Sequence, residues 1–299
     1  MHSFLPVGAL LFNAFVWGVS WWPFRFLHGH GLHPLWATAL MYVLAVAVLL
    51  VLRPQALALA RQHPALWLLA LATGLTNVSF NWAVTVGDVV RVVLLFYLMP
   101  AWSVLLAWRV LGEVPTPMAL VRLVLAFAGV ALVMLPAGTG LVQLQQMGSN
   151  LSGADGLALV GGFCFALVNV TLRRLYRVPG EARMLAMFGG GALMAALSAG
   201  AGMVAGIVAA PPALAPAWAA VALGLTLAFL LGNYALQYGA ARLAAGTTAL
   251  VMLSEVLFAS ASSWWLDAAE LAPRTLAGGA LIVLAALLAT LPARRSAPA

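Results

Sequence analysis

The chain has 299 residues, of which 65% are hydrophobic and 7% are charged. A soluble domain carries about 25% charged residues, so this composition excludes a water-soluble globular protein and indicates an integral membrane protein. The formal net charge of +7 comes entirely from arginines, which are scattered near the ends of apolar segments. Scattered arginines exclude the basic stripe of a nucleic-acid-binding protein and are typical of anchors beside anionic lipid head groups.

The sequence predicts an all-α integral membrane protein with ten transmembrane helices. Each apolar segment has about 20 residues, the length that crosses a hydrocarbon core of about 30 Å. The single cysteine, Cys164, excludes an intrachain disulfide. The predicted spans are 6–28, 33–52, 64–86, 90–110, 118–136, 155–175, 183–208, 215–239, 243–266 and 274–292.

A long polar break after the fifth span divides the chain into two halves. We expect a first five-helix repeat over 1–138, a periplasmic linker over 139–153, and a second five-helix repeat over 154–299 with a short cytoplasmic tail. With the N-terminus inside, eleven arginines fall on the cytoplasmic side and three fall outside. Arginine-rich loops stay in the cytoplasm, so both termini are predicted to be cytoplasmic.

The two halves also repeat each other in sequence. Asn81-Trp82-Ala83 parallels Asn233-Tyr234-Ala235, and Trp17-Gly18 falls opposite Phe165-Ala166. Because each half has an odd number of spans, the second half must run inverted in the membrane. Inverted repeats with a binding site at the midplane are typical of secondary transporters, so we expect a central cavity between the two repeats.

The ninth predicted span carries a carboxylate, Glu255, near its middle. A charge at the bilayer centre costs about 2.5–3.5 kcal/mol on insertion scales, so such a residue usually faces a protein interior or a wet cavity. Glu255 therefore marks the predicted cavity. The alternative is a neutral, protonated carboxyl group that is hydrogen-bonded to a neighbouring helix and has only a structural role.

Other spans bring amides and aromatic rings to similar depths. Amides in lipid are costly unless they face a partner or water, and residues three or four apart share one helix face. Trp17 is the best aromatic candidate, because Asn13 and Ser20 lie on its stripe. The predicted substrate-binding residues are Trp17, Asn81, Tyr97, Asn169, Asn233, Tyr234 and Glu255.

These residues suggest a substrate with a ring at one end and an amine at the other. Glu255 would meet an ammonium group, the amides would hold a carboxylate, and aromatic walls would stack on the ring. An aromatic amino acid meets all three conditions, and a lipophilic aromatic cation meets two. A phosphorylated substrate fits poorly, because no basic residue lies at the midplane. Glu255 could also exchange a proton for the amine, which makes protons a candidate coupling ion.

Motifs for enzyme chemistry are incomplete in this chain. Thr85-Val86-Gly87-Asp88 misses the first glycine of the intramembrane aspartyl protease pattern, and Asn150-Leu151-Ser152-Gly153 misses the rhomboid pattern at Asn150. No Walker loop, zinc-binding His-Glu-x-x-His or Cys/His cluster occurs. We therefore expect no enzyme activity, no cofactor and no metal, with a membrane enzyme or a passive channel as the alternative from a different class.

Several stretches resemble the drug/metabolite transporter superfamily, specifically the EamA-type ten-helix exporters. They are Trp17-Gly18, Leu98-Met99-Pro100, Leu111-Gly112-Glu113 and their echoes in the second half. Within the superfamily, the chain looks most similar to the YddG-type aromatic amino-acid exporters. The resemblance implies two inverted five-helix repeats around a central cavity, location in the bacterial inner membrane, and export of small amino-acid-like metabolites. The runner-up is a multidrug exporter of aromatic cations.

Overall fold

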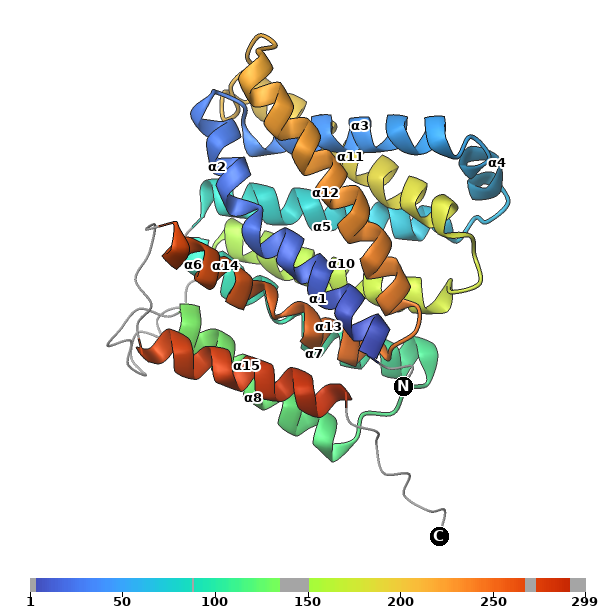
Figure 1. Ribbon diagram of the computed structural model, residues 1–299, viewed down its shortest axis with the longest axis vertical. Coiled ribbons are helices and arrows are strands. Elements are labelled where there is room, and N and C mark those ends of the chain that lie inside the picture. The colour runs from blue at the N-terminus through green and yellow to red at the C-terminus, as the bar shows by residue number, and fades with distance from the viewer. Residues whose placement is uncertain (1–3, 88, 135–150, 267–272, 291–299) are drawn as a thin grey trace.

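The protein is described by a computed structural model that covers residues 4–87, 89–134, 151–266 and 273–290 (Figure 1). Across these ranges the regular structure is entirely helical. Most of the predicted linker 139–153, together with Asp88 and the C-terminal tail, lies outside the described residues.

The helices of the first half follow the predicted spans closely. The first span divides into two helices, a short helix follows the second span, and the fourth span divides into two helices and a π-helical turn. In chain order they are α1 (Phe4–Val19), α2 (Trp21–Gly29), α3 (Pro34–Leu52), α4 (Ala56–Arg61), α5 (Leu66–Val86), α6 (Val89–Phe96), α7 (Met99–Leu106), η1 (Ala107–Leu111) and α8 (Pro117–Met134).

The second half repeats this order with an undivided first helix, and its described residues contain no counterpart of the short helix α4 or of the π-helical turn η1. Ser152 caps that helix, because its side chain accepts from the Asp155 amide while the Asp155 carboxylate accepts from the Ser152 amide. The helices are α10 (Gly153–Arg174), α11 (Gly180–Val204), α12 (Pro216–Ala240), α13 (Ala245–Met252), α14 (Glu255–Trp265) and α15 (Pro273–Thr290).

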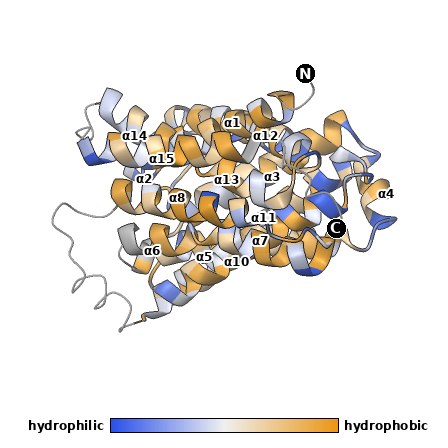
Figure 2. Cartoon of the chain, turned by 90° about the horizontal axis from the view of Figure 1, so that it is seen from below, coloured by the Kyte–Doolittle hydropathy of each residue, from blue (hydrophilic) through white to orange (hydrophobic). Residues whose placement is uncertain are grey.

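Eight helical segments in the described part of the chain are long and apolar enough to cross a membrane. Each matches a predicted span, and Figure 2 shows their apolar residues along the bundle, with hydrophilic residues gathered near α4 and at the free end of α14. The third and tenth predicted spans also form helices, α5 and α15, but do not meet both criteria. In α5, hydroxyl and amide side chains such as Thr73, Thr76 and Asn77 lower the hydropathy.

Three of the predicted spans are interrupted by turns with i→i+3 backbone hydrogen bonds, and a proline or a serine lies at each interruption. Pro100 lacks the amide hydrogen that would continue the helix from α6 into α7. In the other two, a serine hydroxyl donates to a carbonyl three residues back: Ser20 Oγ to Trp17 O at 2.7 Å, and Ser254 Oγ to Val251 O at 2.7 Å. Such bonds compete with helical geometry and bend helices.

Small residues allow the helices to approach closely. A Cβ added to Gly190 of α11 would collide with the Ala70 carbonyl oxygen of α5, and Gly129 of α8 faces the backbone of Gly278 in α15. Figure 1 shows α8 and α15 side by side along one edge of the bundle, while α10 crosses its middle. Tight glycine contacts of this kind are how membrane helices associate without a hydrophobic driving force.

Candidate substrate cavity

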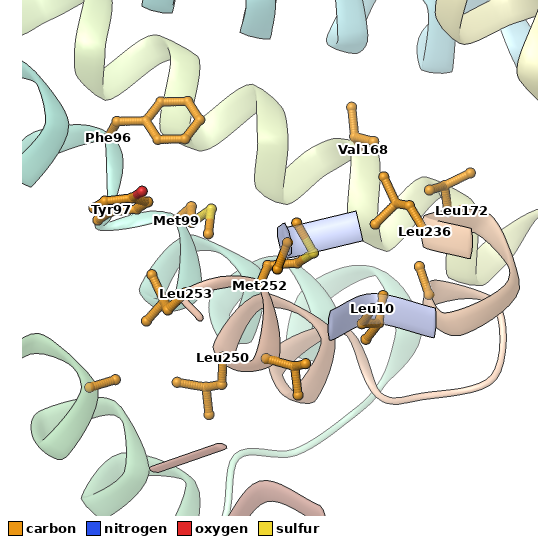
Figure 3. Close-up of a cluster of buried hydrophobic side chains, with 14 of the residues drawn as sticks. Leu10, Phe96, Tyr97, Met99, Val168, Leu172, Leu236, Leu250, Met252 and Leu253 are labelled. Carbon is orange, nitrogen blue, oxygen red and sulfur yellow. The ribbon is translucent and has the colours of Figure 1, made fainter. Parts of the chain in front are cut away.

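A cavity lies in the middle of the bundle, bordered by residues of α1, α3, α5, α6, α7 and α10–α14. About 840 Å³ of the space there is not filled by protein atoms, and part of that space is continuous with the outside. Figure 3 shows one part of its border, where Met99 and Met252 of the two interrupted helices lie close to each other, with Phe96 and Val168 nearby.

Aromatic rings form much of the cavity wall. The Trp17 ring meets the Phe229 ring edge-on at a centroid distance of 4.5 Å, and the Tyr42 ring packs edge-on against Phe188 at 5.1 Å. On another side, the Phe96 ring lies 4.8 Å from that of Phe80. Because these rings come from six different helices, the wall is held by packing of the whole bundle rather than by one element.

Glu255 reaches the cavity from the first residue of α14. Its side chain is half-buried, and its Oε1 atom accepts a hydrogen bond of 2.6 Å from the Tyr97 hydroxyl group. Tyr97 lies between α6 and α7, so this bond joins the interruption of the fourth span to that of the ninth. A Cβ added to Gly18 would lie 2.6 Å from the Glu255 carbonyl oxygen, so this glycine fixes α1 against the same point.

The amides of α5 are held in place by hydroxyl groups of α3. The Tyr42 hydroxyl group donates to Asn77 Oδ1 at 3.1 Å, and Asn77 Nδ2 donates to the Thr73 carbonyl oxygen at 2.9 Å. One turn further, Asn81 Nδ2 donates to Thr38 Oγ1 at 3.1 Å. This side of the cavity is therefore polar, and its groups already have protein partners.

A second amide pair lies on α12. The Asn233 and Gln237 side chains meet at 2.7 Å, and both approach the Met187 sulfur atom of α11. Asn233 lines the cavity, while Gln237 is 2% exposed behind it. The pair places an oriented amide opposite those of α5.

The structure brings together most of the predicted site residues. Trp17, Asn81, Asn233 and Glu255 line the cavity, and Tyr97 is bonded to Glu255. The other two predicted residues lie elsewhere. Asn169 is completely buried in α10, one turn beyond Phe165, and Tyr234 is 63% exposed on the outer face of α12.

Several lining residues were missing from the predicted set, among them Asn13, Tyr42, Asn77 and Phe229. Asn13 and Asn77 carried a sequence signal, because each lies four residues from a predicted site residue on the same helix face. Tyr42 and Phe229 carried none, since both lie in apolar runs where the facing side cannot be deduced from periodicity.

The charge of the cavity is one-sided. Among the residues that the structure describes, no arginine or histidine lines it, so Glu255 contributes its one formal charge. Within the same ranges, no group of three or more His, Cys, Asp or Glu side chains could hold a metal ion.

Comparisons with known proteins found a family match for the first half of the chain. Residues 5–135 match the model of the EamA-like transporter family. No curated protein matches the chain. Among the solved structures that match is a crystal structure of a protein with 19% sequence identity and a TM-score of 0.76. The match covers 98% of this chain and 98% of the other chain, which shows a shared fold. The protein is thus a multi-pass helical membrane protein whose first half matches the model of the EamA-like transporter family.

Proposed function

We propose that the protein is a secondary transporter of the bacterial inner membrane that exports small, aromatic, amino-acid-like metabolites by alternating access. The observation that carries this proposal is a cavity in the middle of the bundle in which one carboxylate, Glu255, faces walls of aromatic rings and amides. The resemblance to YddG-type exporters supports the export direction and the aromatic substrate.

The energetics of the cavity favour a substrate with a ring and an amine. Each aromatic pair contributes about 0.5–1.5 kcal/mol beyond the area that it buries. A cation over an aromatic face gains about 2 kcal/mol when it is desolvated, and a carboxylate nearby adds a charge-assisted hydrogen bond. Trp17 and Glu255 supply both parts, because the Gly18 contact holds α1 directly against Glu255.

We further propose ten spans arranged as two inverted repeats. The helix contacts support this arrangement, because they occur in matching pairs when the halves are exchanged. Thus α5 of the first half packs against α10, and its counterpart in the second half, α12, packs against α1. The counterparts α3 and α11 pack against each other, and so do α8 and α15. Gly162 of α10 meets the Phe96 carbonyl oxygen just as Gly18 of α1 meets that of Glu255.

Contacts at both ends of the cavity support alternating access. On one side, Trp21 Nε1 donates to Ser262 Oγ at 2.9 Å, about two turns beyond Glu255 along α14. On the other side, Arg173 Nε lies 3.7 Å from Glu113 Oε1, whose partner oxygen Oε2 accepts from the Ala245 amide at 3.4 Å. Each contact joins helices from opposite halves, so opening one of them would expose the cavity to one side of the membrane.

A transporter of aromatic cations is the second candidate, and one observation favours it. The cavity holds a carboxylate without any basic side chain among its described lining residues, which suits a substrate with a net positive charge. A passive channel or a membrane enzyme is the candidate from a different class.

Transport by purified protein in liposomes tests these candidates. We expect saturable uptake of labelled tryptophan that phenylalanine inhibits. Inhibition by quaternary ammonium compounds but not by phenylalanine would assign the protein to the cation exporters. A flux that does not saturate would identify a channel and contradict the proposal. If a pH gradient does not change the rate of uptake, proton coupling is excluded and the protein is a facilitator.

A further inference from the structure

Asn13 of α1 is a cavity residue whose side-chain amide has polar atoms that are unpaired in the described part of the chain. Its side chain is 1% exposed and lines the cavity, yet neither Oδ1 nor Nδ2 has a hydrogen-bond partner among the described residues. Leaving a buried polar group unpaired costs about 1–3 kcal/mol, so such a group in a binding cavity indicates a partner that arrives with the ligand.

The other amides of the cavity do not share this property. Asn77 accepts from Tyr42 and donates to Thr73, Asn81 donates to Thr38, and Asn233 is paired with Gln237. Asn13 therefore offers both a donor and an acceptor, while the remaining lining amides are engaged in fixing the helices. A ligand group that matches Asn13 must itself present an acceptor and a donor, as a carboxamide does.

The position of Asn13 relates it to Glu255. Gly18 follows Asn13 by five positions, a rise of about 7.5 Å along α1, and Gly18 is packed against the Glu255 backbone. The amine and carboxamide of an amino-acid amide sit on one carbon. With a hydrogen bond of about 2.9 Å at each end, such a head group spans about 8 Å. Trp17 lines the same cavity and would contact the ring.

The charge of the cavity argues against a free carboxylate at this position. A carboxylate moved out of water needs a cation or several free donors, and the cavity supplies Glu255, which repels it, and one free amide. A neutral carboxamide avoids the repulsion and uses both atoms of Asn13.

We propose that the cavity selects aromatic amino-acid amides, which carry an ammonium group and a neutral carboxamide, over the free amino acids, and that Asn13 recognises the carboxamide. This inference rests on the proposed transport function and names its preferred substrate class. Free amino acids such as tryptophan are carried with lower affinity.

Three matched competitors test the inference: phenylalaninamide, phenethylamine and phenylalanine. They share the ring and the amine but carry a carboxamide, a hydrogen and a carboxylate, respectively. We measure their inhibition of labelled tryptophan uptake in proteoliposomes at about pH 6.5, where α-amino groups are charged. We expect phenylalaninamide to inhibit about tenfold more strongly than phenylalanine, a factor that corresponds to about 1.4 kcal/mol.

The variant Asn13→Leu identifies the residue responsible. It should reduce inhibition by phenylalaninamide to the level of phenethylamine while leaving inhibition by phenethylamine unchanged. Leucine removes an unpaired buried amide, so the variant should fold at least as well as the parent, which its melting temperature checks. Thermal stabilisation of the purified protein by each compound gives a binding readout that does not depend on transport.

The outcomes separate the inference from the proposed function. The inference is overturned if phenylalanine inhibits as strongly as phenylalaninamide or more strongly, or if Asn13→Leu leaves the inhibition by all three compounds unchanged. Saturable tryptophan uptake would still support the transport function in either case. Absence of saturable uptake, together with no stabilisation by any of the three compounds, overturns both.

Discussion

At the scale of single residues, the hydrogen bond between Tyr97 and Glu255 connects the two interrupted helices. Tyr97 is 7% exposed, and its hydroxyl group lies 2.6 Å from the carboxylate. A hydrogen bond to a charged group contributes about 1.5–3 kcal/mol, so the bond is strong enough to fix the orientation of Glu255 toward the cavity.

Tyr97→Phe removes this bond and keeps the ring. We expect the KM for tryptophan uptake to rise about tenfold, because Glu255 loses its fixed orientation. Tyr234→Phe is the matched control. The Tyr234 ring is 63% exposed on the outer face of α12, so this substitution should leave transport unchanged. Equal kinetics for Tyr97→Phe and the parent would show that the bond does not serve binding.

Three of the predicted binding residues show how far a binding site can be predicted from the sequence. Asn233 and Tyr234 are adjacent, and adjacent side chains on a helix point about 100° apart; Asn233 lines the cavity, whereas Tyr234 is 63% exposed. Asn169 shares a face with Phe165 but lies one turn deeper in the packing. Periodicity thus selects a face, while the depth at which the cavity ends depends on the neighbouring helices.

At the scale of helices, the interruptions set the shape of the cavity. The break in the fourth span could be predicted from Pro100. The ninth span was predicted as one continuous helix because Leu253-Ser254 has no proline or glycine, and the structure instead divides it just before Glu255. At this break the Ser254 hydroxyl group donates to the Val251 carbonyl oxygen, a bond that depends on a side-chain rotamer as well as on the residue type.

Gly162 holds α10 against the interruption of the fourth span. A Cβ at this position would lie 2.5 Å from the Phe96 carbonyl oxygen, whereas a Cβ at Gly189 would meet nothing within 4 Å. Gly162→Ala should therefore destabilise the protein by about 1–3 kcal/mol through overpacking and reduce transport, because Phe96 lines the cavity.

Gly189→Ala serves as the control and should leave stability unchanged or raise it slightly, since alanine favours a helix. Melting temperatures of the two purified variants provide the comparison. If both variants have the melting temperature of the parent protein, the close approach of α10 to Phe96 does not contribute to stability.

At the scale of the whole molecule, the arginine distribution predicts the orientation in the membrane. The structure places the exposed residues Gln62, after α4, and His30, after α2, at opposite ends of α3. In a Cys164→Ala background, a cysteine at His30 should react with an impermeant maleimide in intact cells. A cysteine at Gln62 should react only after permeabilisation, and the reverse pattern would invert the predicted orientation.

Glu255→Gln tests the central claim most directly, because it keeps the shape of the side chain and the bond from Tyr97 but removes the one charge among the described lining residues. We compare saturable tryptophan uptake at equal protein amounts, with Glu181→Gln at the start of α11 as the control. The proposed mechanism predicts that Glu255→Gln lowers kcat/KM at least tenfold with an unchanged melting temperature, while Glu181→Gln transports normally. Normal transport by Glu255→Gln would contradict the mechanism and leave Glu255 with a structural role.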